Sequence, residues 1–186
     1  MRIGLVPVSG KPYHIGYHSL VTTAASENDR VILFVSTSDR KRKGEFPIMG
    51  ADMKRVWEQE LEPIMPSNVT IEYGGSPVRK VYMVIEEACQ SNNTDIFTIY
   101  SDPKDTSQNY PPHSRDQYMQ PGCDLGRVIF AAEANPEKFT RGDGTPNVSG
   151  TMMRNYLESG NFEQFARYMP TEVNAENVWE ILRSQQ

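Results

Sequence analysis

The amino-acid sequence predicts an α/β fold, a doubly wound parallel sheet followed by C-terminal helices. Three observations predict it. Short apolar runs rich in β-branched residues recur from the N-terminus to about residue 132. Segments of helical length lie between these runs, an order typical of parallel sheets with right-handed crossovers and helices on both faces. After the last apolar run, only helical patterns follow.

Length and composition are those of a globular domain. The chain has 186 residues, with 38% hydrophobic and 23% charged residues. A domain of this size buries roughly 70% of the surface that its unfolded chain exposes. We therefore expect a single domain over residues 1–186, with an α/β core in 1–135 and a helical part in 136–186.

Charge and cysteine content narrow the class of partner. The net charge of −5 argues against an extended basic face for nucleic acid, but it leaves room for a local anion site. Cys89 and Cys123 are too few for a disulfide framework and lack paired metal-ligand spacing. The apolar run at residues 3–8 is too short to span a membrane. We expect a cytoplasmic protein, with no nucleic-acid or membrane partner.

Five strands and six helices are expected from the pattern, in the order of the chain. The strands cover residues 2–8, 30–36, 69–73, 96–100 and 127–132. Helices are expected at 16–27, 51–61, 78–91, 149–159, 161–168 and 175–183. Met53, Val56, Trp57 and Leu61 fall on one face of the second helix, and Gly160 and Pro170 separate the last three helices. The sheet is therefore five-stranded.

Two long loops follow the second and fourth strands, at residues 37–50 and 101–126. Ligands of parallel α/β sheets bind outside the carboxyl ends of the strands. Long loops in compact domains are more often functional than accidental. We therefore expect both loops at the ligand end of the sheet.

The first strand runs into a turn rich in small residues, which leads to a helix. Such a turn presents backbone N–H groups and the positive end of the helix dipole, which suit phosphate. The nucleotide-binding residues expected here are Pro7, Val8, Ser9, Gly10, His14 and Gly16, and Lys11 is expected to bind substrate. An ordinary surface turn with a capping histidine is the alternative.

Spacing excludes two other chemistries for this turn. A P-loop needs Ser or Thr after Gly-Lys and a glycine five residues before the second glycine, but Pro12 and Leu5 stand there. A zincin helix needs Glu directly after the first histidine, where Ile15 stands. Neither a P-loop nor a metalloprotease is expected, and no protein ligand for a metal is identified.

The turn resembles the HxGH signature of the HIGH-type, or cytidylyltransferase-like, nucleotidyltransferase superfamily. Pro12, His14 and Gly16 match that signature, and the resemblance implies that His14 contacts phosphate. Tyr17 stands where the family has its second histidine. His18 lies about 100° further round the helix. Either the Tyr17 hydroxyl donates to the phosphate, or local winding brings His18 there, so all three side chains are candidates for catalysis.

Residues 147–154, Asn-Val-Ser-Gly-Thr-Met-Met-Arg, resemble the (I/V)SxTxxR signature of the same superfamily. Ser149 can cap a helix, and the Gly150 amide and Thr151 hydroxyl can bind phosphate oxygens. Arg154 adds a charge-assisted donor and is the fourth catalytic candidate. A capped helix with a solvated arginine is the alternative for this segment alone.

Together the two motifs imply a Rossmann-like fold and a transfer reaction. An acceptor oxyanion attacks the α-phosphate of a nucleoside triphosphate in line and expels pyrophosphate, with Mg²⁺ as cofactor. The second motif resembles adenylyl-transferring members more, which favours ATP over CTP. The acceptor is a small phosphorylated molecule, such as a nicotinamide nucleotide, sugar phosphate, phosphopantetheine or choline-like phosphate. Family members are often oligomers, so the resemblance allows a homo-oligomer.

Two other classes stay open. A nucleotide-binding module without turnover is favoured by Tyr17 in place of the second histidine. A protein-interaction domain could reuse the fold, since fold alone does not fix function.

Further candidates lie in the connections after the strands. Arg40 and Lys43, in a run of four cations, can hold triphosphate or an anionic acceptor, or be solvated. Asp102 can orient a ribose hydroxyl or help to hold Mg²⁺, or simply form a turn before Pro103. The remaining substrate-binding candidates are Arg79, Tyr110 and Arg115, for which helix capping or a surface loop is the alternative.

Overall fold

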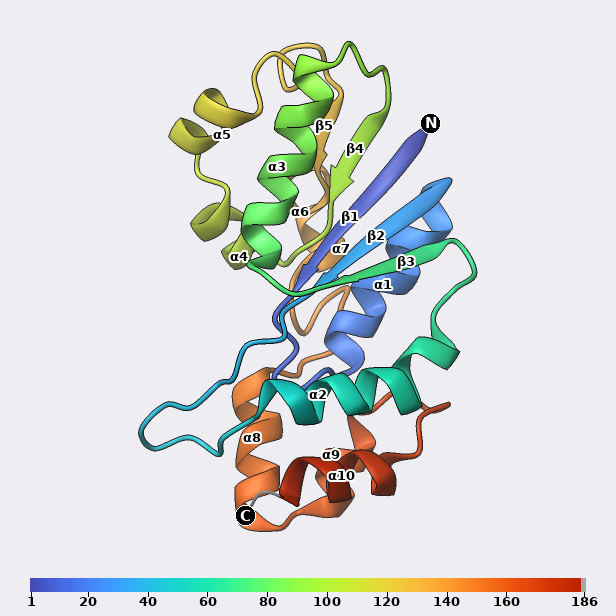
Figure 1. The fold of residues 1–186 in the computed structure, drawn as a ribbon, viewed down its shortest axis with the longest axis vertical. Helices are drawn as coiled ribbons and strands as arrows, with labels where there is room; N and C mark the ends of the chain where they lie inside the picture. The colour runs from blue at the N-terminus through green and yellow to red at the C-terminus, as the bar shows by residue number, and fades with distance from the viewer. Residues whose placement is uncertain (185–186) are drawn as a thin grey trace.

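The computed structural model describes residues 1–184 and contains the predicted five-stranded sheet. Its strands are β1 (Arg2–Val8), β2 (Arg30–Val35), β3 (Val69–Tyr73), β4 (Ile96–Ile99) and β5 (Val128–Phe130). All neighbouring pairs are parallel, in the order β3-β2-β1-β4-β5 (Figure 1). The chain reverses its direction of travel across the sheet between β1 and β4. The ligand crevice of such a sheet lies at that point.

The central strand β1 is buried on both faces of the sheet. Ile3 and Leu5 belong to one hydrophobic cluster, whereas Val6 and Val8 belong to the other. Successive side chains of a strand point to opposite faces, so a strand covered on both sides needs apolar residues throughout. This explains the unbroken apolar run at the N-terminus of the chain.

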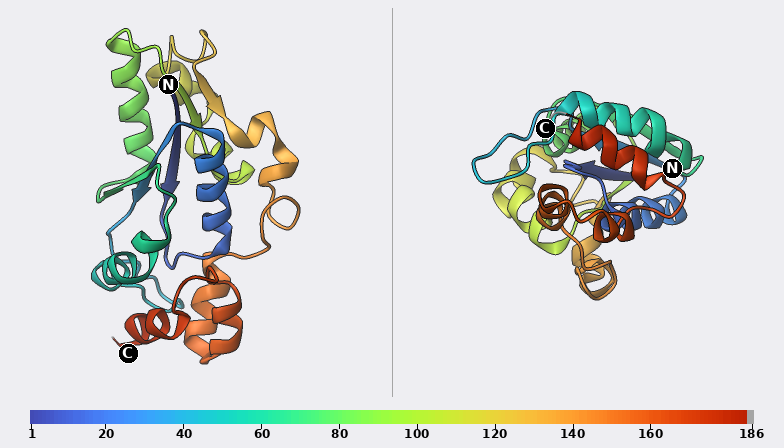
Figure 2. Two further views of the ribbon diagram at one scale, coloured as in Figure 1. Left: turned by 90° about the vertical axis from the view of Figure 1, so that its right-hand side faces the viewer. Right: turned by 90° about the horizontal axis from the view of Figure 1, so that it is seen from below.

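Helices cover both faces, as the doubly wound prediction requires. α1 (Ile15–Glu27) packs on one face and α3 (Pro77–Gln90) on the other (Figure 2). α1 buries Leu20, Val21 and Ala24. The N-terminus of α1 lies directly after β1, so its free N–H groups face the carboxyl end of the sheet.

The C-terminal helices gather at the carboxyl end of the sheet. They are α8 (Gly150–Ser159), α9 (Phe162–Arg167) and α10 (Ala175–Arg183), and α10 lies beside α2 (Gly50–Val56) (Figures 1 and 2). The helix predicted at 51–61 is α-helical only in its first part, α2. A π-helical turn, Trp57–Leu61, and a 3₁₀ turn, Glu62–Ile64, follow α2. Leu61 and Val178 share one buried cluster with β1.

The prediction of a long loop after the fourth strand is wrong. Residues 101–126 are not structureless, because they contain α4 (Pro103–Asn109) and α5 (Pro112–Tyr118). The side chain of Asp102 caps α4, and a proline starts each helix, where its missing N–H has no cost.

The fifth strand is shorter than predicted. Ala131 and Ala132 are apolar because they are buried, but they begin α6 (Ala131–Ala134), which α7 (Pro136–Phe139) follows. Among residues 1–184, no helix has the length and apolar character that crossing a membrane requires.

Candidate functional site

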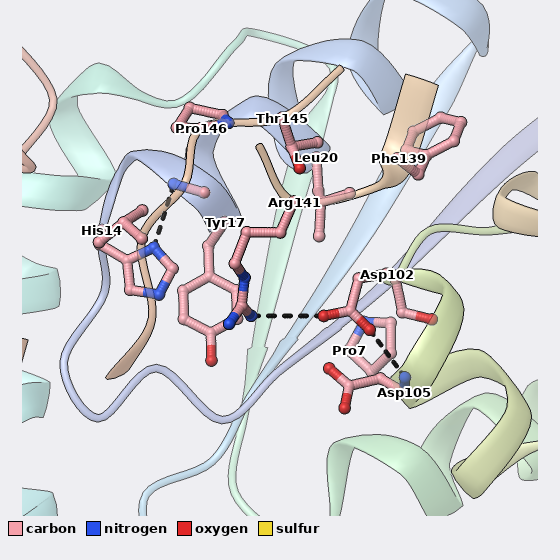
Figure 3. A pocket seen from close by; sticks show the side chains of 13 residues that line it. Pro7, His14, Tyr17, Leu20, Asp102, Asp105, Phe139, Arg141, Thr145 and Pro146 are labelled. Atoms are coloured by element: carbon pink, nitrogen blue, oxygen red, sulfur yellow. Dashed lines mark hydrogen bonds and ion pairs between the residues drawn. The ribbon is translucent and has the colours of Figure 1, made fainter. Parts of the chain in front are cut away.

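A small cavity opens at the carboxyl ends of β1 and β4. Its lining comes from the turn after β1, the start of α4 and the segment that precedes α8 (Figure 3). The lining residues are Pro7, His14, Gly16, Tyr17, Leu20, Ser101, Asp102, Asp105, Phe139, Arg141, Thr145, Pro146 and Val148. The cavity therefore lies where the strand order predicts a ligand.

His14 forms the N-cap of α1 and is only 3% exposed. Its Nδ1 accepts a hydrogen bond of 3.0 Å from the Gly16 N–H. Burial, and secondarily the charge of Arg141, lowers the pKa of His14 to about 3. The ring is therefore neutral near pH 7, and because Nδ1 accepts, the ring proton resides on Nε2. Nε2 is thus a hydrogen-bond donor.

Gly16 lets the His14 ring take this position. A Cβ atom at residue 16 would lie 2.8 Å from both Cε1 and Nδ1 of His14. Any larger residue would push the ring away. Packing against the His14 ring therefore explains why a glycine stands at residue 16 of the first motif.

Tyr17 lies beside His14 in the cavity. The two rings stack with centroids 4.3 Å apart and planes 24° apart (Figure 3). The Tyr17 hydroxyl is 3.2 Å from the Ser9 Oγ. Burial raises the pKa of this hydroxyl, so it keeps its proton. Tyr17 thus offers a second neutral donor next to His14.

His18 does not line the cavity. Its Nδ1 is hydrogen-bonded to the Tyr13 hydroxyl at 2.9 Å. Its backbone N–H donates to the His14 carbonyl, as in regular α-helical winding. Of the two side chains considered for the position of the second histidine of the HxGH signature, Tyr17 lies at the cavity and His18 does not.

Arg154 ties the second motif to the first. It is 6% exposed, and its Nη1 donates to the Lys11 carbonyl at 2.8 Å, across 143 residues of sequence. Its Nη2 donates to the Thr151 Oγ1 at 3.1 Å. Ser149 caps α8 by accepting from the Met152 N–H. The two motifs are therefore joined by a direct hydrogen bond.

Gly150 makes room for the Arg154 side chain. A Cβ at residue 150 would lie 2.8 Å from the Arg154 Nη1. The small residue of the second motif thus has the same kind of steric reason as Gly16 in the first motif.

Sequence reasoning missed two charged residues of the cavity, Arg141 and Asp105. The Arg141 side chain extends toward Asp102, with Nη2 3.4 Å from Oδ2 (Figure 3). Burial, and then the charge of Asp102, raises the pKa of Asp105. A signal for Arg141 was available, because it stands in the glycine-rich run 140–146 just before the second motif.

Asp102 forms the turn that its alternative interpretation expects, and it also reaches the cavity. Its Oδ1 accepts from the Asp105 N–H and caps α4, while its side chain also lines the cavity. Within residues 1–184, no group of three or more His, Cys, Asp and Glu is placed to hold a metal ion.

A second cavity lies at the carboxyl ends of β1 and β2. Its lining residues are Ser9, Lys11, Ser36, Ser38, Asp39, Arg40, Lys41 and Arg42. The buried Lys11 Nζ donates to the carbonyls of Ser9 and Ser36. Burial lowers the pKa of Lys11 to about 8. Lys43 is exposed at the tip of the loop and does not line this cavity.

Like Lys43, three further predicted substrate-binding residues line neither cavity. Tyr110 is fully buried in the core with Phe130. Arg115 pairs with Glu133 at 2.8 Å and donates to the Tyr110 carbonyl. Arg79 is exposed in the first turn of α3. Polar aromatic and basic residues in a connection therefore pack or face solvent here, instead of joining the site.

The other residues predicted to bind the nucleotide here lie at the end of β1 and in the turn after it. Pro7 lines the cavity, Val8 is buried in the core, and Gly10 has a φ of 58°, a conformation that favours glycine.

Comparison with models of known protein families finds no match, and comparison with curated proteins finds none either.

Proposed function

We propose that the chain is a nucleotidyltransferase that transfers a nucleoside monophosphate from a triphosphate to a small phosphorylated acceptor, with release of pyrophosphate. The main observation in support of this proposal is the hydrogen bond from Arg154 to the Lys11 carbonyl. It supports the proposal because it holds two phosphate-binding sequence patterns together, beside a cavity at the switch point of a parallel sheet.

The proposed roles follow from the donors of the site. The N-termini of α1 and α8 attract anions, and Thr151 adds a hydroxyl at the start of α8. The Nε2–H of His14 and the Tyr17 hydroxyl donate to phosphate oxygens, and Arg154 contributes a positive charge. Such fixed donors stabilise the charge that develops on the transferred phosphate. The acceptor is the nucleophile, so no nucleophilic side chain of the protein is required.

Mg²⁺ suits the acidic side of the cavity. Asp102 and Asp105 line it together. Burial, and then the charge of Asp102, raises the pKa of Asp105, and a bound cation would offset the repulsion between the two carboxylates. Magnesium binds through one or two carboxylates plus substrate phosphates, so a pair of carboxylates suffices. When bound, the ion would neutralise charge on the phosphate oxygens.

The donor is proposed to be ATP, with CTP as the alternative, because the Ser149–Arg154 pattern resembles adenylyl-transferring enzymes more. A nucleotide-binding module without turnover is the second candidate, and Tyr17 favours it. A tyrosine hydroxyl donates one hydrogen bond but cannot carry the positive charge of a protonated histidine.

Pyrophosphate release distinguishes the two candidates. The protein is incubated with Mg²⁺, each of the four ribonucleoside triphosphates and a pool of phosphorylated metabolites. The proposal expects pyrophosphate that depends on one triphosphate and on the acceptor pool. Tight triphosphate binding without pyrophosphate would exclude the enzyme and leave the binding module.

A further inference from the structure

A carboxylate of the chain lies between two arginines from distant segments. Arg40 donates to both oxygens of Glu45, through Nε at 2.9 Å and Nη2 at 3.0 Å. The Arg154 Nε lies 3.6 Å from Oε2 of the same carboxylate. Arg40 comes from the loop after β2, whereas Arg154 comes from α8. Glu45 thus bridges the basic loop and the second motif.

The Arg154 Nε has no hydrogen-bond partner within the described residues, although it is buried. The other two nitrogens of this guanidinium are hydrogen-bonded to Lys11 and Thr151. A buried N–H without a partner is unfavourable. The Arg154 Nε therefore faces a place where a better acceptor would be stabilised.

The two guanidinium groups also favour an anion between them. Burial, and next the nearby charge of Arg40, lowers the pKa of Arg154. The hydrogen bonds from Arg40 lower the pKa of Glu45, which keeps its carboxylate charged. Two cations held close to each other need an anion, and Glu45 supplies it in this structure.

The geometry points to a phosphate subsite formed by Arg40 and Arg154, which the Glu45 carboxylate occupies until a phosphate group displaces it. Planar guanidinium groups bind phosphate and carboxylate oxygens in the same bidentate way, so a carboxylate can stand in for a phosphate. The inference rests on the proposed function for the source of the phosphate. That source is either the polyphosphate of the nucleotide or the phosphate of the acceptor.

The Glu45 side chain can move away from the two arginines while the base of its loop stays folded. Arg40 and Ile48 exchange backbone hydrogen bonds of 2.8 and 3.0 Å, which close the neck of the loop. Phe46 and Ile48 are buried in the core. The Glu45 side chain is 29% exposed, and the tip at 41–44 projects from the body of the molecule (Figure 1). Displacement therefore requires a side-chain rotation at the rim.

Glu45→Gln tests the inference, because it removes the charge and keeps the shape. A site that its own carboxylate fills about nine-tenths of the time binds an outside anion roughly tenfold more weakly than a free site. We expect Glu45→Gln to bind inorganic tripolyphosphate or inorganic phosphate roughly tenfold tighter by calorimetry. A gain confined to tripolyphosphate identifies the nucleotide as the source, and a gain with phosphate identifies the acceptor.

Glu58→Gln is the matched control, since Glu58 is 57% exposed, pairs with Lys54 and gives the same change in net charge. The double variant Glu45→Gln, Arg40→Gln should lose the gain. Equal affinities in Glu45→Gln and Glu58→Gln, weaker binding in Glu45→Gln, or a gain that survives loss of Arg40 would each overturn the inference. These titrations involve no turnover, so their failure is separate from failure of the proposed reaction.

Discussion

The neutral state of His14 makes the stability of the protein depend on pH in a way that a single substitution removes. Burial lowers its folded-state pKa to about 3, whereas the ordinary value is 6.5. The unfolded chain therefore binds a proton below about pH 6.5 that the folded chain refuses. Stability is fully present above that pH and is lost as the pH falls toward 3.

The size of the loss follows from the distance between the two pKa values. Each pH unit between them costs about 1.4 kcal/mol. A fall from about pH 7.5 to about pH 5 therefore removes ~2 kcal/mol of stability through His14 alone. Because about pH 5 still lies well above the folded-state pKa, this magnitude depends little on its exact value.

His14→Asn is the appropriate comparison, because asparagine retains an N-cap acceptor without a titrating ring. The free energy of unfolding is measured by urea denaturation of both proteins at the two pH values. We expect wild type to lose ~2 kcal/mol more than the variant between about pH 7.5 and about pH 5. His18, whose pKa burial also lowers, titrates in both proteins and cancels. Equal losses would refute a buried, neutral His14 and the Nε2 donor that follows from it.

Substitutions at three further residues test the site. Tyr17→Phe removes a hydroxyl from the cavity and should slow pyrophosphate release about 10²-fold, while the free energy of unfolding in urea stays unchanged. Tyr17→His should raise the rate of pyrophosphate release. Unchanged rates in both variants would exclude Tyr17 from the site. Gly150→Ala places a methyl group 2.8 Å from the Arg154 Nη1. It should lower the free energy of unfolding by about 1–2 kcal/mol and weaken triphosphate binding. Wild-type triphosphate affinity by calorimetry would contradict this expectation. Arg115→Gln should leave triphosphate affinity unchanged, since Arg115 contacts Glu133 and Tyr110 outside both cavities; a loss of affinity would return it to the site.

The buried strands were predictable because their burial is recorded in consecutive residues. β1 is covered on both faces and reads as an unbroken apolar run, and β1 and β3 end where the pattern predicts. The short helices α4 and α5 were missed because neither has an apolar face long enough to show a period. Their start signals, Asp102-Pro103 and Pro111-Pro112, were nevertheless present.

The site was predictable only where a local pattern carries it. The turn before α1 and the start of α8 both have the form of helix N-termini that suit phosphate, and the structure joins them through Arg154. Arg141 approaches Asp102 across 39 residues of sequence, and no local periodicity records such an approach. Tyr110 is polar and sits in a predicted loop, yet its ring is buried in the core because α3 packs over it.

We propose that the segments around His14 and Thr151 bind the same triphosphate. The most direct test is a calorimetric titration of wild type, His14→Asn and Thr151→Val with the preferred nucleoside triphosphate and Mg²⁺. Thr151 is exposed, so its substitution should leave the fold intact, which urea denaturation verifies. We expect each variant to lose about 1.5–3 kcal/mol of binding free energy, the contribution of a hydrogen bond to a charged group. Wild-type affinity in either variant would show that the two segments do not hold one ligand.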